Sequence, residues 1–122
     1  SQARTYFESI VDTVRGPLIV LAADLCVVSG NRAFYRTFDL LPADVQGRLL
    51  WEIAGGAWST PALRDQVERV LPERSAFEGA EVDAVFPRVG RKQLIVNGRR
   101  LEQQIGLPGL ILLAMEERSG AS

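Results

Sequence analysis

Two apolar runs near opposite ends of the chain constrain its fold more than any other feature. Residues 18–22 and 110–115 are apolar throughout and lack the polar alternation of a strand that faces water on one side. Runs of this length predict β-strands that are covered on both faces. Such strands lie inside a layered sheet, so we expect the first and the last strand of the fold to be central and adjacent.

An amphipathic helix is predicted before the first of these strands, over residues 3–15. Its apolar side chains recur at three- and four-residue spacing and form one stripe, consisting of Tyr6, Phe7, Ile10, Val11 and Val14. Gly16-Pro17 ends the helix, because proline disfavours helical geometry in the residue before it. An isolated helix of this length is marginal in water, so the stripe must pack on its own sheet, on a second copy, or on both.

Short helices are predicted in the middle of the chain. Residues 26–29 form the second expected strand, and Asn31 is a suitable N-cap for a helix over residues 32–38. Two further helical pieces are expected at residues 41–44 and 48–53.

Glycine and proline mark the limits of the remaining helices. Gly55-Gly56 is expected to break the helical piece before it. Thr60-Pro61 predicts a helix start, with a hydroxyl cap and proline at the first helical position. Pro72 is expected to end that helix.

The last third of the chain has the period of a β-strand. Apolar and acidic residues alternate over residues 80–86, which predicts a half-exposed strand, and residues 91–101 predict its partner, with Leu94 and Val96 on one face. The chain is therefore expected to be an α+β domain. Its antiparallel sheet has short helices on one face and the N-terminal amphipathic helix on the other.

Composition excludes several kinds of chemistry. The sequence has no histidine, which removes histidine-ligated haem, the Ser-His-Asp triad and a phosphoaccepting histidine. A single cysteine excludes an intrachain disulfide and fits a reducing compartment. The net charge of −1 gives no support for nucleic-acid binding or for contact with an anionic membrane, and the apolar runs are too short to span a bilayer.

The order of the expected elements resembles that of a PAS domain. The resemblance is carried by the pattern Val20-Leu21-x-x-Asp24-x-x-Val27-Val28-Ser29-x-Asn31-x-Ala33-Phe34 and by the stretch Gly47-Arg48-Leu49-Leu50-Trp51-Glu52-Ile53. It implies a PAS fold with spatial strand order 2-1-5-4-3, which agrees with a central first and last strand. It also implies a cytoplasmic bacterial signalling domain, not itself an enzyme, of the kind found in two-component sensor histidine kinases.

The resemblance further implies how such a domain is organised. Residues 1–16 would form a dimerisation helix that makes a homodimer, residues 17–119 the PAS core, and residues 120–122 the start of a linker to a C-terminal effector domain. Many PAS domains end in Asp-Ile/Val-Thr, and the matching positions are Glu117-Arg118-Ser119. Glu117 keeps a carboxylate and Ser119 a hydroxyl, so these two residues are the candidates for signal relay.

A pocket between the sheet and the short helices is the expected ligand site. The candidate lining residues are inward-facing apolar and aromatic side chains: Phe34, Phe38, Leu50, Ile53, Trp58, Leu63, Val67, Leu94, Val96 and Leu112. Trp51 and Trp58 flank the glycine pair and form either a mobile wall of this pocket or ordinary aromatic packing, which we favour.

No cofactor is predicted. Histidine-ligated haem is disfavoured by composition, and a thiol-adduct flavin is disfavoured because residues 48–53 contain no cysteine. We interpret Cys26 as a small, partly buried apolar residue rather than a reactive thiol. A small-molecule ligand of another class stays open.

Two other functions also stay open. One is a ligand-free scaffold or protein-interaction module. The other is a pocket protein with carboxylate-based catalysis, for which Asp24, Glu52 and Asp83 would need raised pKa values.

Basic residues gather on the predicted hairpin of residues 80–101: Arg88, Arg91, Lys92, Arg99 and Arg100. They form either an anion or partner site or, as we favour, a solvated face paired across strands with Glu78, Glu81 and Asp83.

Overall fold

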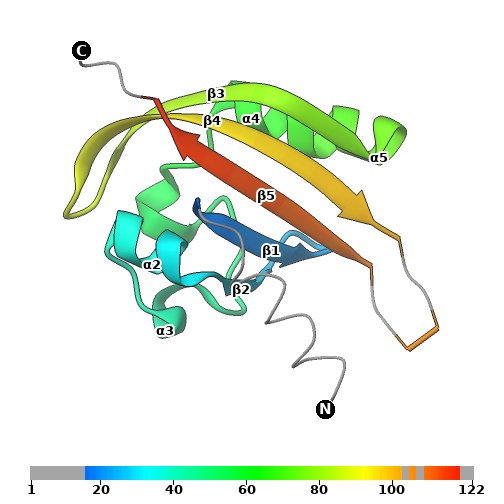
Figure 1. Ribbon diagram of the computed structural model, residues 1–122, viewed down its shortest axis with the longest axis horizontal. Helices are drawn as coiled ribbons and strands as arrows, with labels where there is room; N and C mark the ends of the chain where they lie inside the picture. Colours follow the sequence, from blue (N-terminus) through cyan, green and yellow to red (C-terminus); the bar gives the residue numbers. More distant parts are fainter. Residues whose placement is uncertain (1–15, 103–104, 107–108, 119–122) are drawn as a thin grey trace.

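The computed structural model describes residues 16–102, 105–106 and 109–118, and its centre is a five-stranded antiparallel sheet (Figure 1). The strands are β1 (Leu18–Ala22), β2 (Val27–Gly30), β3 (Ala76–Phe86), β4 (Gly90–Leu101) and β5 (Leu110–Glu117). Their spatial order is β2-β1-β5-β4-β3. The predicted α+β architecture, strand order and central position of the first and last strands are thus confirmed.

Burial along the two central strands follows the predicted pattern only in part. Leu18 to Leu21 of β1 are all at most 4% exposed, so this strand is covered on both faces. In β5, by contrast, Ile111, Leu113 and Met115 are buried, and the side chains between them are half-buried. The prediction of two fully covered faces therefore holds for β1, while β5 is fully covered on one face.

All the described helices lie between β2 and β3 in the chain. They are α2 (Arg32–Phe38), α3 (Pro42–Val45), η1 (Ile53–Gly56), α4 (Pro61–Asp65), η2 (Gln66–Val70) and α5 (Leu71–Arg74). Their apolar side chains share one core with one face of the sheet. Leu18 and Val20 belong to a separate small cluster on the other face. The N-terminal helix predicted for that face lies outside the described residues.

Asn31 begins α2 as predicted and also fixes that helix to the sheet. Its Oδ1 accepts hydrogen bonds from the backbone N–H groups of Phe34 (2.9 Å) and Leu18 (3.0 Å). Its Nδ2 donates to the carbonyl of Gly16 (2.9 Å). One buried amide therefore satisfies backbone groups of both the helix start and the edge of β1.

The prediction of a helix over residues 48–53 is wrong. The backbone of this segment pairs instead with the β1–β2 hairpin: Val27 donates to the carbonyl of Arg48, and Leu50 donates to that of Leu25. These strand-like bonds compete with a helix for the same backbone groups. Gly55 and Gly56 do not break a helix but lie inside the 3₁₀ turn η1, with φ of 67° and 84°, values that glycine adopts without strain.

Pro72 does not end the helix that begins at Pro61. The chain runs from α4 through η2, a π-helical stretch, into α5, which ends only where Ser75 adopts a left-handed conformation. A proline in a regular helix lacks one N–H and collides with the carbonyl four residues earlier. The wider π turn before Pro72 relieves this conflict, so helix and proline coexist.

The sequence pattern predicts β3 only from residue 80, because a bulge before that residue interrupts the alternation of apolar and polar side chains. The register shifts between Phe77 and Ala80, and Gly79 has φ of 77°. The bulge lets both Phe77 and Ala80 face the core despite their three-residue spacing. Phe77 lies over Gly98 of β4, where any side chain would overlap its ring.

Candidate functional site

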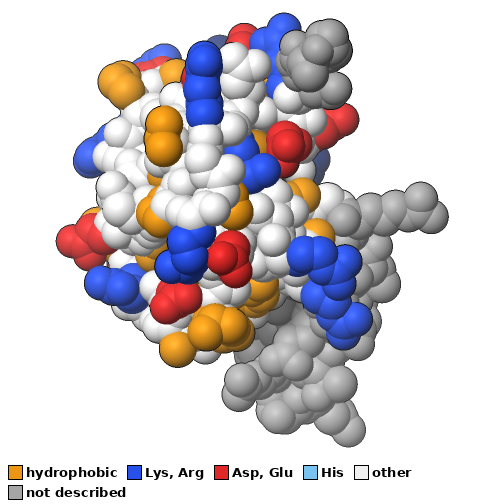
Figure 2. All heavy atoms as spheres, turned by 90° about the vertical axis from the view of Figure 1, so that its left-hand side faces the viewer, with side chains coloured by type: hydrophobic (Ala, Val, Ile, Leu, Met, Phe, Trp, Pro, Cys, Tyr) orange, Lys and Arg blue, Asp and Glu red, His pale blue; other side chains and the backbone are white. Residues whose placement is uncertain are grey.

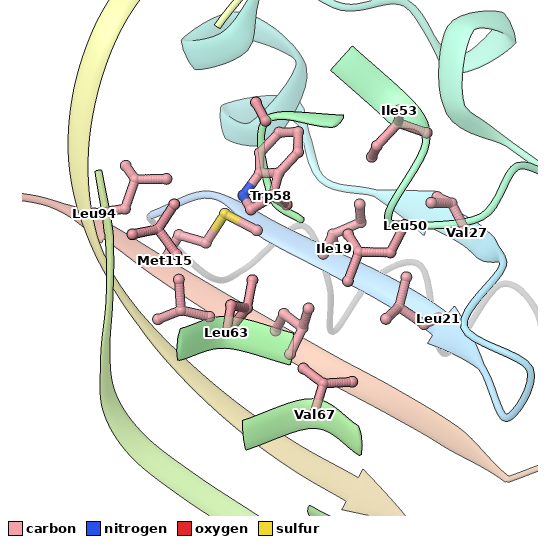
Figure 3. Close-up of a cluster of buried hydrophobic side chains, with 14 of the residues drawn as sticks. Ile19, Leu21, Val27, Leu50, Ile53, Trp58, Leu63, Val67, Leu94 and Met115 are labelled. Atoms are coloured by element: carbon pink, nitrogen blue, oxygen red, sulfur yellow. The ribbon is translucent and has the colours of Figure 1, made fainter. Parts of the chain in front are cut away.

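The predicted pocket interior is filled by side chains. All the candidate lining residues except Leu112 belong to the main core cluster. In Figure 3, Trp58 and Leu63 lie on either side of Met115 of the sheet, and Val67 lies farther along, toward Leu21. These candidates are therefore mainly packing residues.

An aromatic cluster occupies the middle of that core. The ring centre of Trp58 lies 4.8 Å from that of Phe38, 4.8 Å from that of Phe86 and 5.7 Å from that of Phe34. Trp58 is fully buried, and Trp51 is 8% exposed with its Nε1 donating to Glu68 (3.1 Å). Both tryptophans therefore pack as ordinary aromatics, which is the interpretation favoured by the sequence.

Leu112 lies on the opposite face of the sheet from the other candidates. It packs with Leu18 and Val20, whereas its neighbours Ile111 and Leu113 point into the main core. Successive side chains of a strand point to opposite faces. The assignment of Leu112 to the pocket is therefore wrong, and Ile111 is the β5 residue that faces the helices.

An open cleft of about 660 Å³ lies at the edge of this core, where the helical segment from η2 to α5 approaches the end of β4 and the start of β5. Its volume falls within the roughly 300–1,000 Å³ of small-molecule sites. Its apolar lining includes Leu25, Val67, Leu71, Pro72, Leu110 and Ile111. Val67 is the one predicted pocket residue that reaches it.

Three charged residues line the cleft: Glu68, Arg100 and Glu102. Glu68 already accepts hydrogen bonds from Arg64 (3.1 Å) and Trp51 (3.1 Å). Arg100 donates from Nη2 to the hydroxyl of Ser75 at a long 3.4 Å, and its buried Nε has no hydrogen-bond partner in the described part of the chain.

Arg100 was assigned by the sequence to a solvated basic hairpin. Arg100 lies an even number of residues from the inward-facing Leu94 and Val96. Since alternate side chains of a strand share a face, this spacing indicates that the Arg100 side chain faces the helices.

The C-terminal end of β5 is joined to its neighbouring strands by ion pairs. Glu117 Oε1 lies 2.9 Å from the Nζ of Lys92 on β4, and Arg118 Nη1 lies 2.8 Å from Glu81 Oε1 on β3. The backbone N–H of Arg118 also donates to the carbonyl of Gln93 (2.7 Å). We call these contacts the β5 clamp. The other relay candidate, Ser119, lies outside the described residues.

One favoured cross-strand pair of the basic hairpin, Arg91 with Asp83, is present in the structure, whereas Glu81 pairs with Arg118 instead. Arg91 makes two hydrogen bonds to Asp83 (2.8 and 2.7 Å), and Arg88 pairs with Asp39 (3.1 Å). On the face shown in Figure 2, acidic and basic side chains are interspersed. The hydrogen bonds from Arg91 and Gln93 lower the pKa of Asp83 to about 2, opposite to the shift that acid–base catalysis by this carboxylate requires.

The environment of Cys26 does not activate its thiol. Cys26 is half-buried, and partial burial raises the pKa of its thiol. The negative charges of Asp24 and Glu52 raise this pKa further. Since the thiolate is the nucleophilic form, these effects disfavour a reactive cysteine at neutral pH.

Across residues 16–102, 105–106 and 109–118, no group of three metal-ligating side chains is present. No helix in these ranges is long and apolar enough to span a bilayer.

Comparisons with known proteins connect this geometry to one fold. Neither a protein-family model nor a curated protein matches the sequence. Among solved structures, the chain is similar to the PAS domain of Bordetella pertussis BvgS (TM-score 0.73, 15% identity, 99% of this chain and 90% of that one). It is also similar to a PAS domain from a two-component sensor histidine kinase (TM-score 0.71, 8% identity, 96% and 97% covered).

A third similar structure contains a small molecule. It is the PAS domain, in complex with ethanol, of a transcriptional regulator in the LuxR family from Burkholderia thailandensis (TM-score 0.68, 14% identity, 93% and 98% covered). The matches to these three structures cover 93–99% of this chain at 8–15% sequence identity. The chain therefore has the fold of a PAS domain.

Proposed function

We propose that the chain is a sensory and regulatory module of a signalling protein. In this proposal it is a cytoplasmic bacterial domain that forms a homodimer through its N-terminal stripe and regulates an effector domain that follows it. A two-component sensor histidine kinase is the parent protein we favour, and a PAS domain from such a kinase is among the similar structures. The module itself carries no catalytic activity.

One observation carries the proposal: β5 joins the open cleft to the β5 clamp. Leu110 and Ile111 at the start of this strand line the cleft, and Glu117 at its end pairs with Lys92. A ligand in the cleft contacts the strand whose far end leads toward the effector. A signal is transmitted if the ligand binds two arrangements of this strand with different affinity.

The alternatives have weaker support. The filled aromatic core favours a ligand-free scaffold, but the cleft provides a volume that a metabolite can occupy. Carboxylate catalysis is disfavoured because Asp83 on β3 has a lowered pKa and pairs with Arg91 on β4. Asp24 and Glu52 lie elsewhere, where their negative charges raise the pKa of Cys26.

The test uses the full-length protein that contains this chain. We expect a histidine-containing dimerisation helix and an ATP-binding domain after Ser122, and ATP-dependent autophosphorylation as the output. Lys92→Glu and Glu117→Lys each reverse one charge of the β5 clamp. Either variant should change the basal autophosphorylation rate by up to about fivefold, which corresponds to the free energy of one surface ion pair. The double reversal should restore the rate.

The matched control is Arg69→Glu, which reverses one charge of the Arg69–Asp65 pair on the helical segment. It should leave the rate unchanged. Equal effects of the control and the clamp variants would contradict a specific relay role for β5, and the absence of any effector domain after Ser122 would contradict the proposed regulation.

A further inference from the structure

We infer that the cleft binds an amphipathic monocarboxylic acid, with its carboxylate at Arg100 and its apolar part against the helical segment. This inference rests on the proposed sensory function for its biological meaning, and it adds the chemical class of the ligand. It can be measured on the 122-residue chain without any effector.

The guanidinium of Arg100 has N–H donors that no described residue of the chain accepts from. Its Nε is buried without a partner, and its bond to Ser75 is long at 3.4 Å. Its nearest carboxylate oxygen, that of Glu102, lies 3.8 Å away, beyond hydrogen-bond distance. The unpaired Nε itself has no contact with solvent, but the side chain of Arg100 is 37% exposed, so a ligand in the cleft can reach the rest of the guanidinium. A buried charged group with an unused donor gains stabilisation from an added acceptor.

The guanidinium geometry selects a carboxylate among possible acceptors. Two parallel N–H groups of arginine match the two oxygens of a carboxylate, and such charge-assisted bonds are about twice as strong as neutral ones. A neutral amide or alcohol provides only one acceptor at the same place.

The other charges of the cleft limit the ligand to one negative charge. Glu68 and Glu102 also line the cleft, so a second acidic group or a phosphate dianion would be repelled. An amine finds no matching site, because Glu68 is already bonded to Arg64 and Trp51, and because the side chain of Glu102 is 76% exposed to water.

The remainder of the cleft suits an apolar body. Val67, Leu71 and Ile111 are at most 6% exposed, and all three line the cleft. Val67 and Glu68 belong to the π-helical stretch η2, and single π turns inside helices occur frequently at functional sites. The cleft therefore presents an apolar wall beside a guanidinium whose ion pair with Glu102 is loose, at 3.8 Å.

The test measures binding of octanoate, 1-octanol and octylamine to the chain by calorimetric titration. Octanoate should bind at least about tenfold more tightly than either uncharged or cationic analogue, as expected for a charge-assisted pair. Arg100→Gln should remove this preference and leave octanol binding unchanged, which also shows that the variant is folded. Arg99→Gln is the matched control, since it removes the same charge from the adjacent position on the other face of β4.

A second variant changes affinity in the opposite direction without touching the core. Glu102→Gln removes a carboxylate beside Arg100 and should strengthen octanoate binding about two- to fivefold at low salt. Equal affinities for the three probes, or a preference that survives Arg100→Gln, would overturn the assignment of the ligand class. Tight octanoate binding without any change in autophosphorylation would keep the ligand class and reject the sensory function.

Discussion

Asn31→Ala should be among the most destabilising single changes to a polar side chain in this domain. Asn31 is 1% exposed, and its amide bonds to the backbone of Leu18, Phe34 and Gly16. Alanine removes all three hydrogen bonds together. The backbone N–H groups of Leu18 and Phe34 and the carbonyl of Gly16 then lose Asn31 as their partner.

The magnitude follows from the two roles of this amide. Loss of the N-cap of α2 costs about 1 kcal/mol. The N–H of Leu18 is buried at the end of β1, and leaving such a donor unsatisfied costs about 1–3 kcal/mol. We therefore expect the free energy of unfolding to fall by about 2–4 kcal/mol, a large share of the roughly 5–15 kcal/mol that stabilises a typical domain.

Urea denaturation followed by tryptophan fluorescence measures this change, because Trp51 and Trp58 are both buried in the folded state. Asn31→Ser keeps a capping oxygen but cannot span to β1, so its effect should be intermediate. The matched control is Asn97→Ala, which removes an exposed bond to Gly79 and should cost less than about 1 kcal/mol. If Asn31→Ala were no more destabilising than Asn97→Ala, the proposed joining of α2 to β1 would be refuted.

Three other predictions concern the surface, the sheet and the dimer. Asp83 has a folded pKa of about 2, below its usual 3.8, so the stability it contributes is present above pH 4 and lost as the pH falls toward 2. In urea titrations across this range, Arg91→Gln should reduce that loss, and an unchanged pH profile would refute the pairing. Gly98→Ala should lower the free energy of unfolding by about 1–3 kcal/mol, because its methyl group overlaps Phe77, and Phe77→Ala should make the glycine change less costly in a double-mutant cycle. If the chain forms the proposed homodimer, Ile10→Asp should convert it to a monomer in light scattering, whereas a monomeric wild-type chain at high micromolar concentration would reject the N-terminal interface.

The sheet was predictable from sequence because its signals are local. The run over β1 and the alternation of apolar and acidic residues in β3 each report directly which faces are covered. Asn31 likewise identified the start of α2 from a single residue, since a capping side chain acts within three positions.

The features that were missed depend on contacts between distant segments. Nothing near Leu49 indicates that it pairs with Cys26 of the hairpin, and this pairing replaces the expected helix. The helix through Pro72 required a π turn, whose cause is not visible in a count of apolar positions.

The candidate site shows the same division. Leu94 and Val96 are placed correctly on the core face by their two-residue period, but periodicity cannot distinguish a packed core from a cavity. The cleft forms where η2 meets the ends of β4 and β5, so its position depends on tertiary packing. Arg100 lines the cleft because the fold brings the end of β4 against the helical segment, and the local pattern around Arg100 indicates the face of its side chain but not that contact.

Hydrogen exchange at the backbone amide of Arg118 tests the central claim, that the cleft and the β5 clamp are coupled through one strand. This amide donates to the carbonyl of Gln93 at 2.7 Å, so its exchange rate reports directly on opening of the clamp. At an octanoate concentration that saturates the cleft of the wild-type chain but not that of Arg100→Gln, the rate should change severalfold in the wild-type chain and much less in the variant. An exchange rate that stays constant while octanoate occupies the cleft of the wild-type chain would contradict the account.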